Sequence, residues 1–193
     1  MPERAYDVRM RYAIVIILMA GCALLSGLPV HCQSPKCDPS LGLSKMEHMP
    51  PKGRLQEVGS PQARRIIQLN KGAIPQLIAC LTNETKTKEP IEDYWPATTV
   101  GDIAFLFLCD LFTDSSWQHS TIDGVVNWKT LEIEYPNEPA FTAWYSFVEK
   151  HGRKYVQEVW SKKWKEEEQA IFWDEKEQCF KIDPHATRKN DRP

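Results

Sequence analysis

The side chains best suited to acid–base or nucleophilic chemistry lie in the middle of the chain. His119 stands in the stretch Ser115-Ser116-Trp117-Gln118-His119-Ser120. A histidine beside a serine hydroxyl can serve as the base of a hydrolytic site, although geometry decides whether the two meet. Asp110 is flanked by apolar residues, and a carboxyl group buried in a pocket would have a raised pKa. We favour a structural role for Asp110, at a helix end or beside a basic group.

Two further carboxylates alternate with apolar residues in Leu131-Glu132-Ile133-Glu134-Tyr135. This alternation predicts a short β-strand with one wet face, which would place Glu132 and Glu134 side by side. A carboxylate pair is the machinery of glycoside cleavage. Two glutamates on the solvent side of an edge strand explain the same pattern, and we favour that interpretation. A small envelope-polymer hydrolase that uses His119, Asp110 or Glu132/Glu134 is therefore the alternative function.

Familiar signatures of cofactor and metal chemistry are missing from the sequence. It has no G-x-S-x-G, H-E-x-x-H, P-loop or dinucleotide-binding motif. The five histidines are scattered, and there is no C-x-x-C pair. With 24 Lys+Arg against 26 Asp+Glu, the chain lacks the basic excess of a nucleic-acid binder. We expect no cofactor, no metal site and no nucleic-acid partner.

The N-terminal segment predicts export. Arg4, Arg9 and Arg11 precede an uncharged apolar run over 13–30, which is the pattern of a secretory signal peptide. We expect residues 1–32 to be removed, which leaves a slightly acidic periplasmic or secreted chain. Two alternatives remain: residues 13–30 as an uncleaved membrane anchor with 33–193 outside the cytoplasm, and a lipoprotein lipidated at Cys22.

Four cysteines remain after such a cleavage, namely Cys37, Cys80, Cys109 and Cys179. An even number in an exported chain indicates disulfides, and four cysteines allow three pairings. Because two of them lie in apolar helical segments, we expect a Cys80–Cys109 bridge between packed helices. Cys37–Cys179 would then join the two ends of the domain. The alternative is that Cys80 and Cys109 are buried thiols that pack as small apolar side chains.

The elements that would position these residues are mostly helices. Capping and periodicity predict helices over 60–70, 73–81 and 100–112, the last with a capping box formed by Thr99 and Asp102. A long amphipathic helix starts at Asn137 and is broken near Gly152. We expect a tight hairpin turn over 122–125 and a closing hairpin over 171–182. The predicted fold is mainly α, a compact bundle of about four to five helices with short β-hairpin additions.

These elements define a single helical domain over 60–183. A Pro-rich leader over 33–59 precedes it, and a flexible tail over 184–193 follows. A long polar connection over 82–98 separates two of the helices and carries Tyr94 and Trp95. These two aromatic residues either anchor the connection to the core or contact a partner. The connection also holds Asn83-Glu84-Thr85, a glycosylation sequon that matters in a eukaryotic host.

One local resemblance stands out. The run Gly72-Ala73-Ile74-Pro75-Gln76-Leu77-Ile78-Ala79-Cys80-Leu81 resembles the first helix of a HEAT-type repeat, whose pattern is close to A-I-P-x-L-I-x-x-L. Residues 100–112 would take the place of the second helix. The resemblance implies a scaffold or partner-binding surface without chemistry of its own. We read it as a local helix pair, and we expect a non-catalytic domain that binds a protein or envelope component, through Tyr94 and Trp95.

Overall fold

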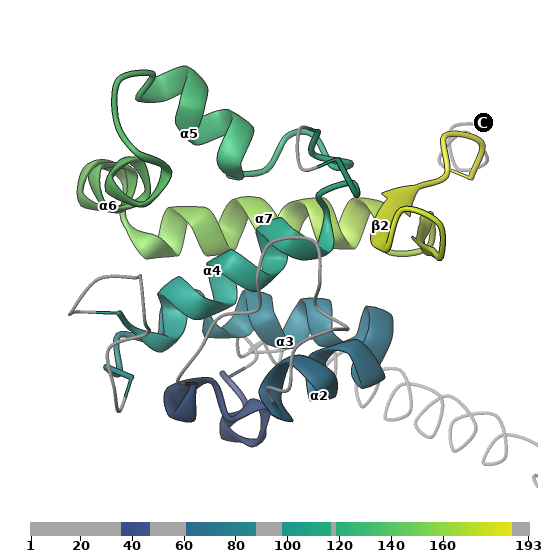
Figure 1. The fold of residues 1–193 in the computed structure, drawn as a ribbon, viewed down its shortest axis with the longest axis horizontal. Coiled ribbons are helices and arrows are strands. Elements are labelled where there is room, and N and C mark those ends of the chain that lie inside the picture. Colours follow the sequence, from purple (N-terminus) through teal and green to yellow (C-terminus); the bar gives the residue numbers. More distant parts are fainter. Residues whose placement is uncertain (1–35, 47–60, 88–97, 117–118, 187–193) are drawn as a thin grey trace, which may run out of the picture. The chain divides into compact units, whose positions relative to one another are not determined.

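A computed structural model of the chain describes residues 36–46, 61–87, 98–116 and 119–186 (Figure 1). All of these residues belong to one compact unit, Pro35–Pro193. This unit is mainly helical with one small antiparallel hairpin, as the sequence predicted. In Figure 1, α5 (Trp128–Glu134) and α6 (Ala140–His151) lie on one side of α7 (Arg153–Glu167), while α2 (Pro61–Leu69) and α3 (Ala73–Cys80) lie on the other.

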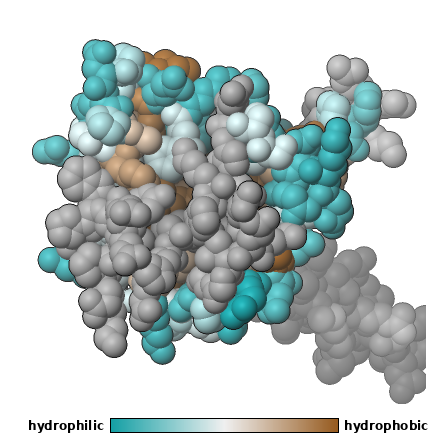
Figure 2. All heavy atoms as spheres, viewed as in Figure 1, coloured by the Kyte–Doolittle hydropathy of each residue, from teal (hydrophilic) through white to brown (hydrophobic). Residues whose placement is uncertain are grey.

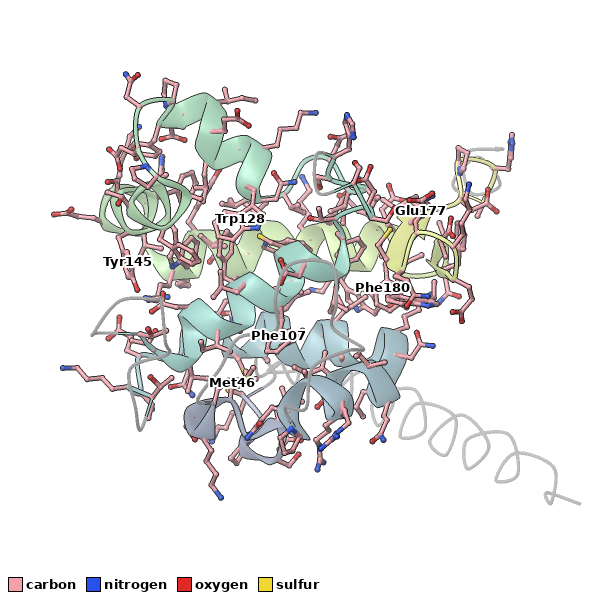
Figure 3. The ribbon with its side chains drawn as sticks, viewed as in Figure 1. Met46, Phe107, Trp128, Tyr145, Glu177 and Phe180 are labelled. Carbon is pink, nitrogen blue, oxygen red and sulfur yellow. A yellow bond between two sulfur atoms is a disulfide. The ribbon has the colours of Figure 1, made fainter. Side chains whose placement is uncertain are left out.

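Helix α4 (Val100–Leu111) is the centre of the core, because every one of its residues is buried. The predicted capping box starts it: the Thr99 side chain accepts from the Asp102 backbone N–H, and the Asp102 carboxylate accepts from the Thr99 backbone N–H. A helix that is apolar almost all round is stable only when other elements surround it. Figure 3 shows Phe107 and Met46 below this helix, toward the short 3-10 turn η2 (Leu43–Lys45) that packs on it.

The first helices form a continuous unit that packs on α4. Helix α2 (Pro61–Leu69) begins at Pro61, whose fixed φ suits a first helical position. The 3-10 turn η3 (Asn70–Gly72) leads into α3 (Ala73–Cys80), which packs against α4. A Cβ atom at Gly101 would lie 2.5 Å from the Leu81 carbonyl oxygen. The absence of a side chain at Gly101 therefore allows the close approach of the two segments.

Residues 128–134 form helix α5 (Trp128–Glu134), so the strand predicted for 131–135 was wrong. The Asn127 side chain caps the helix by accepting from the Thr130 backbone N–H at 3.0 Å. Trp128, Leu131 and Tyr135 then fall on one helical face and pack against the core. Ile133 points outward and is 72% exposed. An alternation of five residues is a weak indication of a strand. The Asn127 cap and the spacing of the apolar residues at three and four positions favour the helix instead.

Two longer helices follow. Helix α6 (Ala140–His151) has Pro139 rather than Asn137 at its N-cap, and α7 (Arg153–Glu167) begins directly after Gly152. Gly152 has φ 80°, a conformation that favours glycine, so the predicted break there is confirmed. The described residues hold six α-helices, more than the expected number because α5 was missed and α6 and α7 are separate.

The closing hairpin was predicted correctly. Strands β1 (Ile171–Asp174) and β2 (Cys179–Ile182) pair antiparallel, with Trp173 opposite Phe180. Phe180 packs against the end of α4 through Phe112. The hairpin expected at 122–125 is wrong: Gly124 does adopt φ 76°, but the described residues around it form bends and no paired strands.

The surface carries few large apolar side chains. Figure 2 shows hydrophilic residues over much of the described face, with smaller apolar patches between them. The exposed large apolar residues in the described part come from α5, α7 and β1; they are Ile133, Tyr155 and Phe172. Within the same part, every helix is too short or too polar to cross a bilayer.

Candidate ligand-binding site

The described part of the chain contains a cavity of about 400 Å³ beside α5. This volume lies within the range of small-molecule sites. Its walls come from the connection that follows α4, from α5, from the turn after α5 and from the start of α6. The lining residues are Thr113, His119, Ser120, Asn127, Trp128, Lys129, Leu131, Glu132, Tyr135, Pro136, Glu138, Ala140 and Ala143.

Asn127 fixes the connection between α4 and α5, which forms one wall of the cavity. Its amide nitrogen donates to Ser120 Oγ at 2.9 Å and to the Ile122 carbonyl at 3.1 Å, while its amide oxygen caps α5. Asn127 is not among the residues predicted from the sequence. Its signal was an asparagine three residues before Thr130, the usual arrangement of an N-cap. Asn127 therefore fixes both the loop and the helix that border the cavity.

The aromatic wall is equally fixed. Trp128 meets Phe105 edge-on at 5.3 Å and Phe141 at 5.7 Å between ring centroids. Figure 3 shows Trp128 below α5, in the interior between the helices. Edge-to-face aromatic packing of this kind favours one orientation of each ring. The lining thus combines one aromatic ring, packed against two neighbouring rings, with polar and charged side chains.

Two carboxylates and one ammonium group are the charged groups of Glu and Lys in this lining. Glu132 is exposed and Glu138 is partly buried, and Glu138 accepts a hydrogen bond from Ser146 Oγ at 2.8 Å. Lys129 is the basic residue of the lining, and its ammonium group lies 3.6 Å from the Asp123 carboxylate. The lining therefore holds two carboxylates and one ammonium group, so its Glu and Lys side chains together carry a net negative charge.

His119, a predicted catalytic residue, lines the cavity, and its side chain is 73% exposed. Its Nδ1 is 3.2 Å from Asp114 Oδ2, and Ser116 Oγ donates to the other oxygen of Asp114 at 2.7 Å. The Ser116 bond is the main cause that lowers the pKa of the Asp114 carboxyl. The hydroxyls of Ser115 and Ser120 donate to Glu177 and to the Ile122 carbonyl. The imidazole is therefore bound to a carboxylate, and the serine–histidine pair is not assembled through Ser115 or Ser120.

The predicted pair of Glu132 and Glu134 is separated, because two residues on a helix differ by about 200° in direction. Glu132 borders the cavity. Glu134 accepts hydrogen bonds from Lys150 Nζ at 2.7 Å and lies 2.9 Å from His151 Nε2. The Lys150 bond is the largest cause that lowers the pKa of Glu134. Glu134 therefore joins α5 to the end of α6 instead of forming a carboxylate pair.

Asp110, the third predicted catalytic position, is buried in the last turn of α4. It is not among the residues that line the cavity. The cavity therefore brings together His119 and Glu132 from the predicted catalytic set, while Asp110 and Glu134 lie elsewhere.

A buried ionic cluster, also missed by the sequence analysis, joins three helices. Asp102 Oδ1 accepts from Trp144 Nε1 at 2.7 Å and from Arg153 Nη2 at 2.6 Å. Phe105 stacks on the Trp144 ring at 3.7 Å between centroids. Burial, and next the Asp102 charge, raise the pKa of Tyr145 to about 12. The sequence predicted the role of Asp102 in the capping box. It did not predict that the same carboxylate accepts from Trp144 and Arg153.

The cysteines pair differently from the expectation. Cys37 and Cys80 form the disulfide, so neither Cys80–Cys109 nor Cys37–Cys179 is present. Cys109 and Cys179 are buried thiols, as the alternative proposed for Cys109. Burial raises the pKa of the Cys179 thiol to about 11, which disfavours the reactive thiolate form. The leader therefore bonds to the end of α3 instead of the C-terminal hairpin.

Several predicted features lie outside the described residues. They are the binding residues Tyr94 and Trp95, the apolar run over 13–30, and Cys22. Within the described ranges, no three His, Cys, Asp or Glu side chains are grouped to hold a metal ion. Comparison of the chain with protein-family models, with curated proteins and with solved structures gives no match.

Proposed function

We propose that the chain is an exported, non-catalytic module that binds a protein or envelope component, and that the cavity beside α5 takes a positively charged group of that partner. The observation that carries the proposal is the cavity itself, whose lining holds Glu132 and Glu138 together with Trp128, a ring that packs against Phe105 and Phe141. Carboxylates at a partly enclosed site attract cations more strongly than carboxylates in open water. A lysine or arginine side chain meets this requirement.

Export is supported by the Cys37–Cys80 disulfide, since disulfides persist in oxidising compartments. The N-terminal pattern of three arginines before an apolar run also supports export. An acidic cavity on an exported helical module fits the binding of a basic segment outside the cytoplasm.

The hydrolase remains a second candidate because His119 and Glu132 border the same cavity. Asp114 holds His119 through Nδ1, which leaves Nε2 as the nitrogen for proton transfer. Against this candidate, His119 is highly exposed, and Ser120 in the same lining donates to a backbone carbonyl. A binding role needs no such assembly.

The test is a titration of the full chain with a short peptide of alternating lysine and glycine, followed by backbone amide NMR. We expect saturable shifts that concentrate on the lining residues of α5 and α6. The double variant Glu132→Gln/Glu138→Gln should weaken binding about tenfold, roughly 1.4 kcal/mol. The matched control Glu149→Gln/Glu158→Gln makes the same charge change at exposed sites on α6 and α7 and should bind within about twofold of wild type.

Three outcomes would contradict the binding proposal. Equal weakening in both double variants would show that the peptide follows general surface charge. Equal shifts with a glutamate–glycine peptide would exclude a cation site. Cleavage of a soluble amino-sugar oligomer that is abolished by both His119→Ala and Glu132→Gln would favour the hydrolase.

A further inference from the structure

The sequon Asn83-Glu84-Thr85 lies in a turn that is held by one hydrogen bond within the sequon and by backbone bonds to neighbouring segments. Asn83 Oδ1 accepts from the Thr85 backbone N–H at 2.9 Å, which is an Asx turn. The backbone around it is fixed from outside: Asn83 N donates to the Cys80 carbonyl, and the Asn83 carbonyl accepts from Gly101 N. The carbonyl of Thr85 accepts from Val100 N at 2.9 Å.

These bonds leave the reactive atom of the side chain unused. Oδ1 is held by the turn, whereas Asn83 Nδ2 makes no hydrogen bond within the described residues. Asn83 itself is partly exposed, and its neighbours Thr82, Glu84, Thr85 and Lys86 are exposed. A large substituent on Nδ2 therefore has room to extend into solvent without displacing a core residue.

The turn is also local enough to form early. The Asn83–Thr85 bond joins residues only two apart, so this bond can form before the backbone bonds from Val100 and Gly101. Glycan transfer to an asparagine takes place on a chain that is still entering the secretory pathway. A sequon that adopts its turn without tertiary contacts is available at that stage, and the folded domain then tolerates the product.

We propose that Asn83 is an acceptor for an N-linked oligosaccharide when the chain passes through a eukaryotic secretory pathway, an inference that rests on the export part of the proposed function. The co-reactant is an oligosaccharide linked to a lipid diphosphate. The bond from sugar C1 to the diphosphate oxygen breaks, a bond from C1 to Asn83 Nδ2 forms, and Nδ2 loses one proton. The lipid diphosphate leaves with the bonding electrons, and no oxidant or reductant takes part.

The experiment is secretion of the full chain from cultured animal cells, followed by treatment with an N-glycan amidase. We expect the wild type to lose apparent mass on treatment, with Asn83 converted to aspartate in peptide mass spectra. The sequence holds one N-x-[ST] motif, so a single site accounts for any shift. Thr85→Ser should keep the glycan. Thr85→Ala should lose it, and so should Asn83→Asp, which retains an acceptor oxygen for the turn.

The controls separate this inference from export. Wild-type protein that is secreted without a glycan would overturn the assignment of Asn83 and leave export intact. A glycan that persists in Asn83→Asp would overturn it as well. If the chain stays in the cytosol, export is wrong, and the full chain preceded by a heterologous secretory signal then decides the glycosylation by the same mass shift.

Discussion

The carboxylate of Asp102 serves two purposes at once. One oxygen accepts from the backbone N–H and hydroxyl of Thr99 at the start of α4. The other accepts from Trp144 on α6 and Arg153 on α7. The Arg153 side chain is 11% exposed, and its Nη1 has no hydrogen-bond partner within the described residues. Burying such an ion pair costs desolvation energy, so the pair adds little net stability. Removing one partner is strongly destabilising, because the other charge then stays buried without a counter-charge.

We therefore expect Arg153→Met to lower the free energy of unfolding by about 3 kcal/mol, because Asp102 would stay buried without its cation. Urea denaturation followed by tryptophan fluorescence measures the change. The matched control is Lys154→Met, whose side chain is 83% exposed and whose ion pair with Glu158 is long at 3.8 Å. That variant should differ from wild type by less than about 0.5 kcal/mol. Equal losses in the two variants would contradict a special role for Arg153.

At the scale of the elements, α3 packs on α4 because the start of α4 comes close to the backbone of the residues that follow α3. A methyl group at Gly101 would meet the Leu81 carbonyl at 2.5 Å and the Asn83 carbonyl at 3.2 Å. Backbone groups cannot move aside as a flexible side chain can. Gly72, in contrast, has helical φ and ψ, and a Cβ atom there would have no described atom within 4 Å beyond its own chain neighbours.

We expect Gly101→Ala to destabilise the protein by about 1–3 kcal/mol through overpacking. Gly72→Ala should stabilise it by about 0.4–1 kcal/mol, since it restricts the unfolded chain without a clash. Thermal unfolding of both variants provides the comparison. The two substitutions are expected to change the stability in opposite directions. A gain in stability for Gly101→Ala would contradict the close packing and show that the two helices can separate there.

The link between α5 and α6 predicts a dependence on pH. Bonds from Lys150 and His151 lower the pKa of Glu134 below its usual 4.5. A carboxyl group with a lowered folded-state pKa stabilises the fold above its unfolded pKa and loses that contribution as the pH falls through the folded value. Glu134→Gln should therefore reduce the urea midpoint at about pH 6 and have little effect at about pH 3.

The comparison for this prediction is Glu149→Gln, an exposed change on α6. Its midpoint should follow that of the wild type across the same pH range. A difference between Glu134→Gln and wild type that grows below about pH 4 would have the wrong sign and would refute the linkage.

At the scale of the whole molecule, the Cys37–Cys80 bond attaches the segment before α2 to the end of α3. It closes a loop with a sequence separation of 43 residues. In the chain-entropy description, such a closure stabilises the fold by about 4 kcal/mol. Leu41, Leu43 and Met46 lie within this loop and are buried in the core, so the bond also keeps them near their contacts.

We expect Cys37→Ala/Cys80→Ala to lose about 4 kcal/mol of unfolding free energy, and the wild type to lose a similar amount on reduction. The double variant should not respond further to reductant. Alkylation of the unfolded chain should label Cys109 and Cys179 before reduction, and Cys37 and Cys80 after it. Protection of Cys109 and Cys179 before reduction would contradict the pairing.

The sequence by itself determined the features that depend on near neighbours. The capping box of α4, the start of α2 at Pro61, the break at Gly152 and the closing hairpin each involve bonds or conformations within a few residues. The hairpin expected over 122–125 and the helix cap expected at Asn137 were wrong. The strand expected over 131–135 was also wrong: this segment belongs to α5, where a five-residue alternation competed with an asparagine cap. In so short a segment, packing of Trp128 and Leu131 on the core decides between helix and strand.

Tertiary structure alone decided which distant side chains meet. The partner of Cys80, the contact of Asp102 with Arg153 across 51 residues and the gathering of His119 and Glu132 at one cavity all depend on the faces that helices present to one another. Hydrophobic burial, which brings those faces together, is non-directional and does not specify partners along the chain. The residue types were visible in the sequence, and their combination into a cavity, a disulfide and a buried ion pair followed from packing.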